Sequence, residues 1–339
     1  MSNNILNTKL SIDNKIFDFY PVKNQVIYNL YKKAEKAYWT EEEIILSNDL
    51  NNWKNVLNDN ERHFISHILA FFYQSDQVVT INLKDRFSKD VETLPNDLKI
   101  YVQHFYEFQI MIENIHTQVY GRILHTYISN EEEKDYYKNS ISTIPCIRKK
   151  AQWATKWIDD KNTSFATRLI AFAILEGIFF SGSFCAIFWL KERDNDNQNL
   201  LPGLFQSNAF ISRDEALHTE FAVTLYNLLK KRNDFELHCT NEIIIKMIQD
   251  AVDIESEFIT SSIKCDMIGM NPKLMIQYIQ HVSDVLLQNL DIEPHFKVDN
   301  PFKFMINLGL INKANFFDVK DTNYAKAEIG NDITLDLDF

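Results

Sequence analysis

A stretch of 22 residues from Leu169 to Leu190 carries only one charged side chain, that of Glu176. The stretch is long enough to cross a membrane as a helix. However, a carboxylate near its middle would cost several kcal/mol in lipid, and the chain has no second stretch of this kind. We therefore predict no membrane span, but a helix that is buried on all sides within a large helical protein. Such burial requires a buried partner for Glu176.

The chain is also poor in the residues that make tight turns. It has 7 glycines and 7 prolines among 339 residues, whereas glycine alone usually makes up about 7% of a globular protein. Sandwiches, barrels and propellers need many tight turns. The composition therefore excludes these folds and predicts an all-α protein.

Charge and cysteine content exclude further classes of protein. A net charge of −12 argues against a surface that binds nucleic acid. The N-terminus lacks the apolar core of a signal peptide, and no G-x-G-x-x-G or other phosphate-binding loop occurs. The cysteines lie far apart without a C-x-x-C pair, which predicts reduced thiols and a cytoplasmic location. They are Cys146, Cys185, Cys239 and Cys265.

Apolar periodicity predicts a series of long helices between two less regular ends. We expect residues 1–25 to be partly ordered, residues 26–317 to form one helical domain, and residues 318–339 to form a flexible acidic tail. Helices are expected at about 25–39, 60–88, 97–127, 131–158 (one or two), 165–191, 204–231, 241–267 and 272–290.

Two of these helices carry the same pair of side chains. Glu113 and His116 are three residues apart, and Glu215 and His218 repeat that spacing. Residues three apart lie on one face of a helix. A single E-x-x-H arises often by chance, but two of them inside apolar helices are much less expected. Ferritin-like bundles that bind two iron or manganese ions use this pair twice, with one carboxylate from each of two other helices.

The two further carboxylates are also present. Asp76 lies in the apolar sequence AFFYQSDQVV, and Glu176 is the lone acid of the stretch described above. Four ionised carboxylates cannot share a dry interior unless their charge is balanced, and two divalent cations balance it. Oxygen and nitrogen ligands without thiolate favour iron or manganese over structural zinc. The alternative, that these are separate groups on helix surfaces, is disfavoured by their apolar flanks.

A tyrosine and several apolar side chains share the predicted site. Tyr120 lies one turn beyond His116 on the same face. Phe180, Phe184 and Ile211 lie one or two turns from Glu176 or Glu215. A redox metal pair, a tyrosine and a dry apolar wall are what a stored radical requires. His63 and His67 also have a ligand-like spacing, but we expect them to be structural or exposed, because His67 points away from Asp76 on the same helix.

With these residues in place, the chain resembles the small, radical-storing subunit of class I ribonucleotide reductase of the eukaryotic and viral type. The resemblance runs from about Phe17 to Phe339. It is carried by KKAEKAYWTEEEI, FISHILAFF, ENIHTQVY, IPCIRKKAQWATKWI, EGIFFSGSF, FWLK, SNAFISRDEALH, DMIGMN, NPF, NFF and the terminal TLDLDF.

The resemblance implies a role for each site residue. Asp76, Glu113 and His116 would bind one iron, and Glu176, Glu215 and His218 the other, with Glu113 and either Glu215 or Glu176 bridging. Tyr120 matches the radical tyrosine. The long-range radical-transfer chain is matched by Trp39, Asp214 and Tyr324, with His116 linking the metal to Asp214.

The resemblance also implies cofactors and partners. Two iron ions per chain would be activated by dioxygen, with manganese as a possible native metal. The chain would form a homodimer, and its C-terminal tail would dock on the large subunit, which reduces ribonucleotides to deoxyribonucleotides. No nucleic acid or membrane partner is expected.

Several residues depart from the family pattern. Where the family usually has Gly-Ile-Val-Asn-Glu-Asn-Leu after the ligand aspartate, residues 77–83 read QVVTINL. The departures are at Gln77, Thr80, Ile81, Glu107, Met111 and Val285. None of them removes an expected ligand or a residue of the transfer chain. Three alternatives stay open: an iron-storage ferritin, a di-iron oxygenase with an organic substrate, and a catalytically silent paralogue of the subunit.

Overall fold

The computed structural model describes residues 19–159, 163–193, 200–232, 239–262 and 265–307. Within these ranges every regular element is helical and none is a strand, so the prediction of an all-α protein is confirmed. The expectations for residues 1–18 and for the tail at 318–339, including Tyr324, lie outside the described residues.

The helices run in chain order with short connections between them. Their bounds are α1 Gln25–Lys36, α2 Ser47–Asn55, α3 Asp59–Asn82, α4 Ser88–Val91, α5 Asn96–Tyr127, α6 Glu131–Lys138, α7 Ser140–Thr143, α8 Pro145–Ala154, α9 Phe165–Ile174, α10 Ser181–Arg193, α11 Pro202–Lys230, α12 Asn241–Glu257, α13 Pro272–Asn289 and α14 Lys303–Asn307. Among the described residues, four π-helical turns lie at Leu83–Phe87, Thr155–Asp159, Leu175–Phe179 and Phe258–Ser262, and two 3-10 turns at Glu41–Glu43 and Cys265–Ile268.

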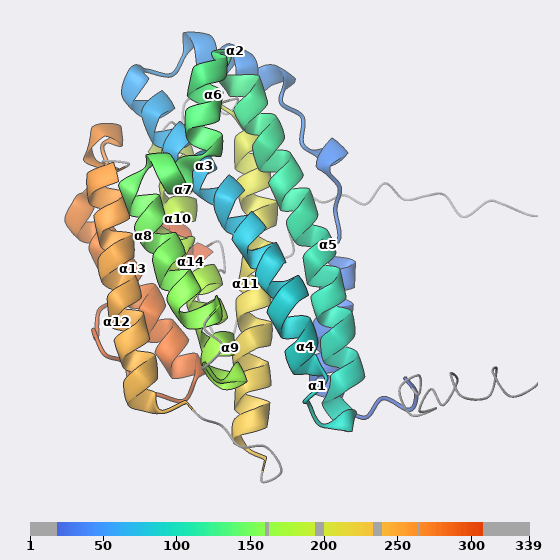
Figure 1. Ribbon diagram of the computed structural model, residues 1–339. Helices are drawn as coiled ribbons and strands as arrows, with labels where there is room; N and C mark the ends of the chain where they lie inside the picture. The colour runs from blue at the N-terminus through green and yellow to red at the C-terminus, as the bar shows by residue number, and fades with distance from the viewer. Residues whose placement is uncertain (1–18, 160–162, 194–199, 233–238, 263–264, 308–339) are drawn as a thin grey trace, which may run out of the picture.

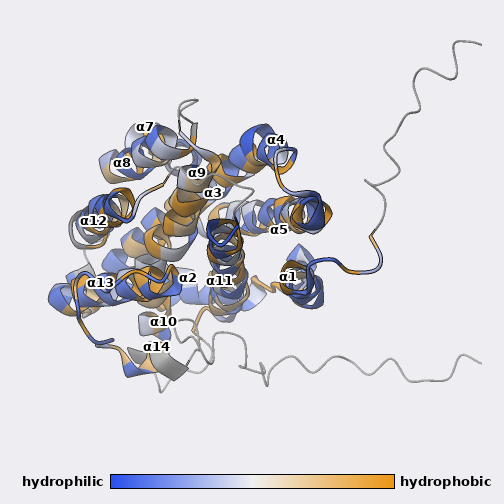
Figure 2. Cartoon of the chain, turned by 90° about the horizontal axis from the view of Figure 1, so that it is seen from below, coloured by the Kyte–Doolittle hydropathy of each residue, from blue (hydrophilic) through white to orange (hydrophobic). Residues whose placement is uncertain are grey.

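Long helices that lie side by side form the centre of the molecule (Figure 1). Helix α3 packs along α5, and α11 packs along α9 and its continuation. Figure 2, which looks along the bundle, shows α1 outside α5 and α11, with α8, α12 and α13 toward the opposite side. This arrangement is a ferritin-like bundle, as the sequence predicts.

The long apolar stretch lies inside this bundle. By length and composition, residues Phe165–Lys191 could cross a membrane, but 94% of their most apolar window is buried by the rest of the protein. This agrees with the prediction of a buried core helix. The expected continuous helix is interrupted, however, because residues Leu175–Phe179 form a π-helical turn between α9 and α10. Such turns occur often at functional sites, and this one carries Glu176.

Polar side chains begin the central helices where the sequence predicts helix starts. Asn58 accepts a hydrogen bond from the backbone N–H of Glu61, whose carboxylate accepts one from the N–H of Asn58, so that the two form a capping box for α3.

Helix α1 ends at Lys36 rather than at the predicted Trp39. The carbonyl of Ala37, just beyond the helix, accepts a hydrogen bond from Arg213 of α11.

The N-terminal N–H groups of helix α11 are bound by a buried carboxylate from another helix. Asp49 of α2 is fully buried and accepts hydrogen bonds from the backbone N–H groups of Gly203 and Leu204 at 2.9 and 2.8 Å. The hydroxyl of Tyr127, at the end of α5, donates to the same carboxylate at 2.7 Å. A carboxylate at a helix N-terminus satisfies free N–H groups and complements the helix dipole. Asp49 therefore ties α2, α5 and α11 together.

We predict that Asp49→Ala lowers the free energy of unfolding by about 2–3 kcal/mol, because it leaves buried N–H and hydroxyl donors without an acceptor. Urea unfolding followed by circular dichroism measures this. Asp59→Ala is the control, since the Asp59 carboxylate lies in the first turn of α3 but is 96% exposed. Equal small losses in the two variants would contradict the role given to Asp49.

Candidate metal centre

The six predicted ligands come from the central elements of the bundle. Asp76 lies on α3, and Glu113 and His116 lie on α5. Glu176 lies in the π-helical turn after α9, and the second E-x-x-H pair lies on α11. None of the six side chains is more than 3% exposed. The structure thus gathers in its core polar groups that the sequence distributes over about 140 residues, from 76 to 218.

The six residues form two groups that overlap. In the first group, ligand atoms of Asp76, Glu113 and His116 lie within 4.8 Å of one another. The second group has the same spread and consists of Glu113, Glu176, Glu215 and His218. Glu113 belongs to both groups. The arrangement therefore offers two adjacent sites that share a carboxylate.

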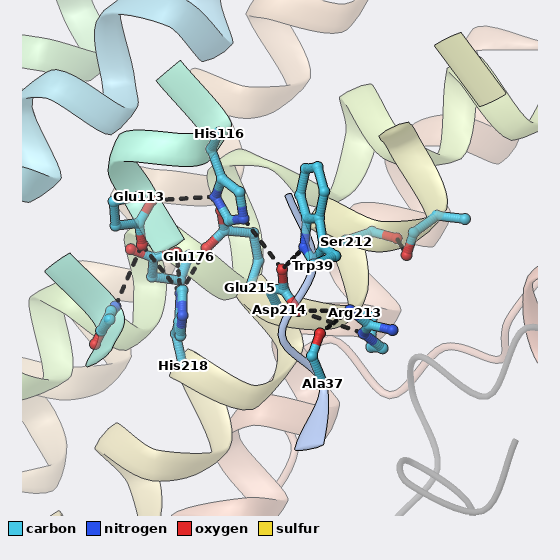
Figure 3. A network of polar contacts seen from close by, with 12 residues as sticks. Ala37, Trp39, Glu113, His116, Glu176, Ser212, Arg213, Asp214, Glu215 and His218 are labelled. Carbon is cyan, nitrogen blue, oxygen red and sulfur yellow. Dashed lines mark hydrogen bonds and ion pairs between the residues drawn. The ribbon is translucent and has the colours of Figure 1, made fainter. Parts of the chain in front are cut away.

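The two histidines point their Nδ1 atoms at the same two carboxylates (Figure 3). His116 Nδ1 lies 3.2 Å from one oxygen of Glu113 and 3.1 Å from one oxygen of Glu215. His218 Nδ1 lies 3.1 and 3.0 Å from the other oxygens of the same residues. Each of these two glutamates therefore has one oxygen toward each histidine, as a bridging ligand of two ions does.

Burial and mutual repulsion shift the pKa values of these groups. Burial, followed by the charge of Glu113, raises the pKa of Asp76. Burial and Glu215 likewise raise the pKa of Glu176. Burial alone would lower the pKa of His116 and His218, but the adjacent carboxylates raise both well above the usual value. The cluster thus attracts positive charge strongly.

Several oxygen atoms of the cluster have no hydrogen-bond donor. Both carboxylate oxygens of Asp76 and both of Glu176 are buried and accept no hydrogen bond from the part of the chain that the structure describes. Buried carboxylates are otherwise paired or bound to metal. Four carboxylates and two imidazoles match two divalent cations in charge and in donor type. The residues present therefore fit a dinuclear metal site.

A hydrogen-bonded path leads outward from His116. Its Nε2 lies 3.2 Å from Oδ2 of Asp214, and the indole N–H of Trp39 donates to the same oxygen at 2.6 Å. The Trp39 ring also stacks on the imidazole, with 5.9 Å between ring centroids. A histidine ligand whose second nitrogen contacts a carboxylate is typical of metal sites. The structure brings these three residues together, while Tyr324 lies outside the described residues.

Tyr120 lies in a dry aromatic pocket. Its side chain is 2% exposed, and its hydroxyl has no hydrogen-bond partner among the described residues. Burial, followed by the charge of Asp76, raises its pKa well above the usual value. The ring stacks on Phe72 at 4.9 Å. Phe72 in turn contacts Phe180 and Phe184 at 5.5 and 4.9 Å, so these two predicted residues form the outer part of the wall.

The other sequence expectations near the site have clear outcomes. Ile211 is fully buried. Nδ1 of His67 lies 2.8 Å from the carbonyl of His63, and neither histidine is in the metal clusters, as expected. Two of the departures from the family pattern, Ile81 and Met111, are 58% and 38% exposed and lie on the outer faces of α3 and α5.

Three contacts of the site were missed by sequence reasoning. They are the stacking of Phe72 on Tyr120, a 3.4 Å hydrogen bond from Gln109 to Glu113, and the ion pair between Arg213 and Asp214. Phe72 and Gln109 each lie four residues before an expected ligand. The same-face rule that identified Tyr120 could have found both. Arg213 gave no such signal, because it is adjacent in sequence to its partner.

Comparison with known proteins agrees with this geometry. Residues 16–301 match the family described as "Ribonucleotide reductase, small chain". The ribonucleoside-diphosphate reductase small chain of Encephalitozoon cuniculi is 47% identical over 339 residues, covering 98% of both chains. A ribonucleoside-diphosphate reductase small chain of Arabidopsis thaliana is 48% identical over 320 residues, which cover 94% of this protein and 88% of that one.

Solved structures are similar as well. The ribonucleotide reductase Rnr4 homodimer from Saccharomyces cerevisiae has a TM-score of 0.72 and 32% identity, with 85% of each chain covered. The dimanganese(II)-NrdF of Streptococcus sanguinis, at 18% identity and a TM-score of 0.70 over 86% of this chain and 97% of that one, shows likeness of fold. These similarities favour a ribonucleotide reductase small chain over an iron-storage ferritin or a di-iron oxygenase of organic substrates. The chain belongs to the family of ribonucleotide reductase small chains and is the small subunit of an oxidoreductase, ribonucleoside-diphosphate reductase.

Proposed function

We propose that this chain binds two metal ions in its core and stores on Tyr120 a radical that is used for ribonucleotide reduction. The observation that carries the proposal is the pair of overlapping clusters that share Glu113. Glu113 and Glu215 would serve both ions, since each has one oxygen toward each histidine. Asp76, Glu113 and His116 would hold the first ion, and Glu176, Glu215 and His218 the second.

The chemistry proposed for the site is the one-electron oxidation of a phenol. When bound, a reduced pair of iron or manganese ions would supply oxidising power by reaction with dioxygen. Tyr120 would then supply one electron and one proton to the reduction of dioxygen, and would become a neutral tyrosyl radical. The ring of Phe72 keeps water and reductants away from the phenol.

The stored radical leaves through the path from His116 to Trp39. Asp214 accepts from the indole N–H at 2.6 Å and contacts the imidazole at 3.2 Å, so electron and proton movements can be coupled at this carboxylate. Arg213 donates hydrogen bonds to the carboxylate of Asp214 and to the carbonyl oxygen of Ala37. On the sequence pattern we place Tyr324 at the outer end of the path.

The assembly and the native metal are further parts of the proposal. Substrate reduction belongs to a large subunit, because this sequence has neither a phosphate-binding loop nor a C-x-x-C dithiol. The tail at 318–339 would dock there. A homodimer is supported by the similar Rnr4 homodimer. The donor set suits iron, with manganese as the alternative. Cytoplasmic location is supported by three buried cysteines that form no disulfide within the described ranges, Cys146, Cys185 and Cys239.

We predict two metal ions per chain, one for each cluster, and the loss of at least one in Glu176→Ala. This variant removes a carboxylate whose oxygens have no donor among the described residues. Metal analysis after loading with Fe(II) measures the content. Glu220→Gln is the control, because Glu220 lies on α11 two residues beyond His218 but pairs with Lys33. Full metal content in Glu176→Ala would refute the assignment of this ligand.

We predict that Tyr120→Phe abolishes the stored radical and reductase activity while metal binding stays intact, because the change removes only the oxidisable hydroxyl. Electron paramagnetic resonance after loading with iron and oxygen detects the radical. Asp214→Ala is the complementary variant: its radical should form, while turnover with the large subunit falls by orders of magnitude.

The same spectrum separates this function from a silent paralogue. A wild-type protein that binds both metal ions but forms no tyrosyl radical would favour the silent paralogue. Normal turnover in Tyr120→Phe would show that Tyr120 only packs in the core.

We predict that deletion of residues 333–339 abolishes binding to the large subunit and leaves the metal site and the Tyr120 radical unchanged. The deleted segment alternates apolar and polar residues, ITLDLDF, and such a segment can order when it binds a partner. Pull-down with the large subunit measures binding, and a free peptide of the same sequence should compete. Tyr324→Phe should bind normally but not turn over. Unchanged activity after the deletion would contradict the docking role.

A further inference from the structure

The π-helical turn that carries Glu176 has its last carbonyl groups held by side chains. A π-helical turn disturbs the regular hydrogen bonding of the helix on either side of it. Here the carbonyl of Ile178 accepts from the hydroxyl of Ser181 at 2.7 Å. The carbonyl of Phe179 accepts from the ammonium group of Lys150 at 2.9 Å. Ser181 is a near neighbour in sequence, whereas Lys150 comes from α8, on the side of the bundle away from α5.

Lys150 is an unusual residue to find in a core. Its side chain is 3% exposed, and its Nζ lies 3.6 Å from the ring centroid of Phe71 and 3.8 Å from that of Phe258. It forms an ion pair with Glu255 of α12, which is fully buried. Burial lowers the pKa of Lys150 to about 8, against the opposing effect of Glu255. Buried ion pairs contribute little to net stability compared with apolar residues of the same size, so stability is a weak reason for this pair.

Glu255 lies close to the helix that follows the same end of the turn. Helix α10 begins at Ser181, and a Cβ atom added at Gly182 would lie 2.5 Å from Oε1 of Glu255. Only a glycine therefore allows the carboxylate to lie against the first turn of α10. A carboxylate at a helix N-terminus is favourable. Lys150 thus holds the carbonyl before α10, and its ion-pair partner Glu255 lies against the first turn of α10.

The cage of Lys150 is continuous with the wall of the tyrosine pocket. Phe71 contacts Phe180 at 5.3 Å between centroids and Phe72 at 5.6 Å. Phe72 stacks on Tyr120. Lys150 therefore supports, through one layer of phenylalanine rings, the same residues that line the proposed radical site.

We propose that Lys150 and Glu255 are positioning residues that fix the turn at Leu175–Phe179, so that the carboxylate of Glu176 faces the second metal site. Neither residue is among the six proposed metal ligands. The inference rests on the proposed function, since it concerns the geometry of one of those ligands. Groups that orient metal ligands typically contribute 10- to 100-fold to metal affinity.

The test is a double variant, Lys150→Met with Glu255→Gln. Removing both charges together avoids a lone buried charge, which a single variant would leave. We expect a folded protein by circular dichroism and thermal unfolding. We also expect its affinity for the more weakly bound Mn(II) ion to fall by about 10- to 100-fold. Electron paramagnetic resonance of the free Mn(II) that remains during a titration measures this without any assay of activity.

The same two helices provide a matched control. Lys149 and Glu257 form an ion pair at 2.6 Å between α8 and α12, but their side chains are 49% and 41% exposed. Lys149→Met with Glu257→Gln should bind both Mn(II) ions with wild-type affinity. Gly182→Ala, which keeps both charges but forces Glu255 and Ile259 away from the first turn of α10, should reproduce the weaker binding. Lys150→Arg, with Glu255 left unchanged, should keep most of the wild-type Mn(II) affinity, because arginine is still a cation and a hydrogen-bond donor.

Each outcome decides the matter. A folded double variant with wild-type Mn(II) affinity overturns the inference, and so does one that does not fold, since the pair would then serve folding rather than ligand geometry. Wild-type protein that fails to bind two Mn(II) ions would instead overturn the proposed function. Loss of affinity in the double variant and in Gly182→Ala, but not in the exposed pair, supports the inference.

Discussion

The presence of four carboxylates in one dry core is the constraint on which the rest of the structure depends. Like charges in a medium of low polarity repel strongly, and burial raises the pKa of Asp76 and Glu176 accordingly. The elements that carry these groups are held in place by polar contacts at their ends. Asn58 caps α3, and the carboxylate of Asp49 accepts a hydrogen bond from the first turn of α11. Lys150 holds the turn that carries Glu176. These contacts therefore keep the four carboxylates together in the core, whereas in water the same groups would repel one another and move apart.

Much of the fold and of the site geometry could be predicted from the sequence because helical periodicity is local. Spacings of three and four residues put Glu113, His116 and Tyr120 on one face, and in the structure all three are buried on α5, with Glu113 and His116 in one cluster. Glu176 could be identified because it is the only charged residue in a long apolar stretch, so that its burial required a partner. The all-α, ferritin-like fold follows from these helices and from the shortage of turn residues.

The remaining features depend on contacts between distant parts of the chain. The helix after Gln25 ends at Lys36, and the carbonyl of Ala37 just beyond it accepts a hydrogen bond from Arg213, 176 residues further along the chain, a contact that no local rule predicts. The π-helical turn at Leu175–Phe179 is equally hidden, since a straight helix with the same apolar residues would also be buried. Its geometry depends on Lys150 and Glu255, from two other helices.

The hydroxyl of Tyr120 is buried without a hydrogen-bond partner among the described residues. Return of a tyrosyl radical to the neutral phenol takes up a proton together with an electron, and burial disfavours the tyrosinate that an electron alone would give. A pocket that offers no donor therefore slows the loss by withholding the proton. Under the proposed function, the lifetime of the radical would be controlled kinetically rather than by a favourable potential. The aromatic wall around Phe72 would then keep protons as well as electrons away from the stored radical.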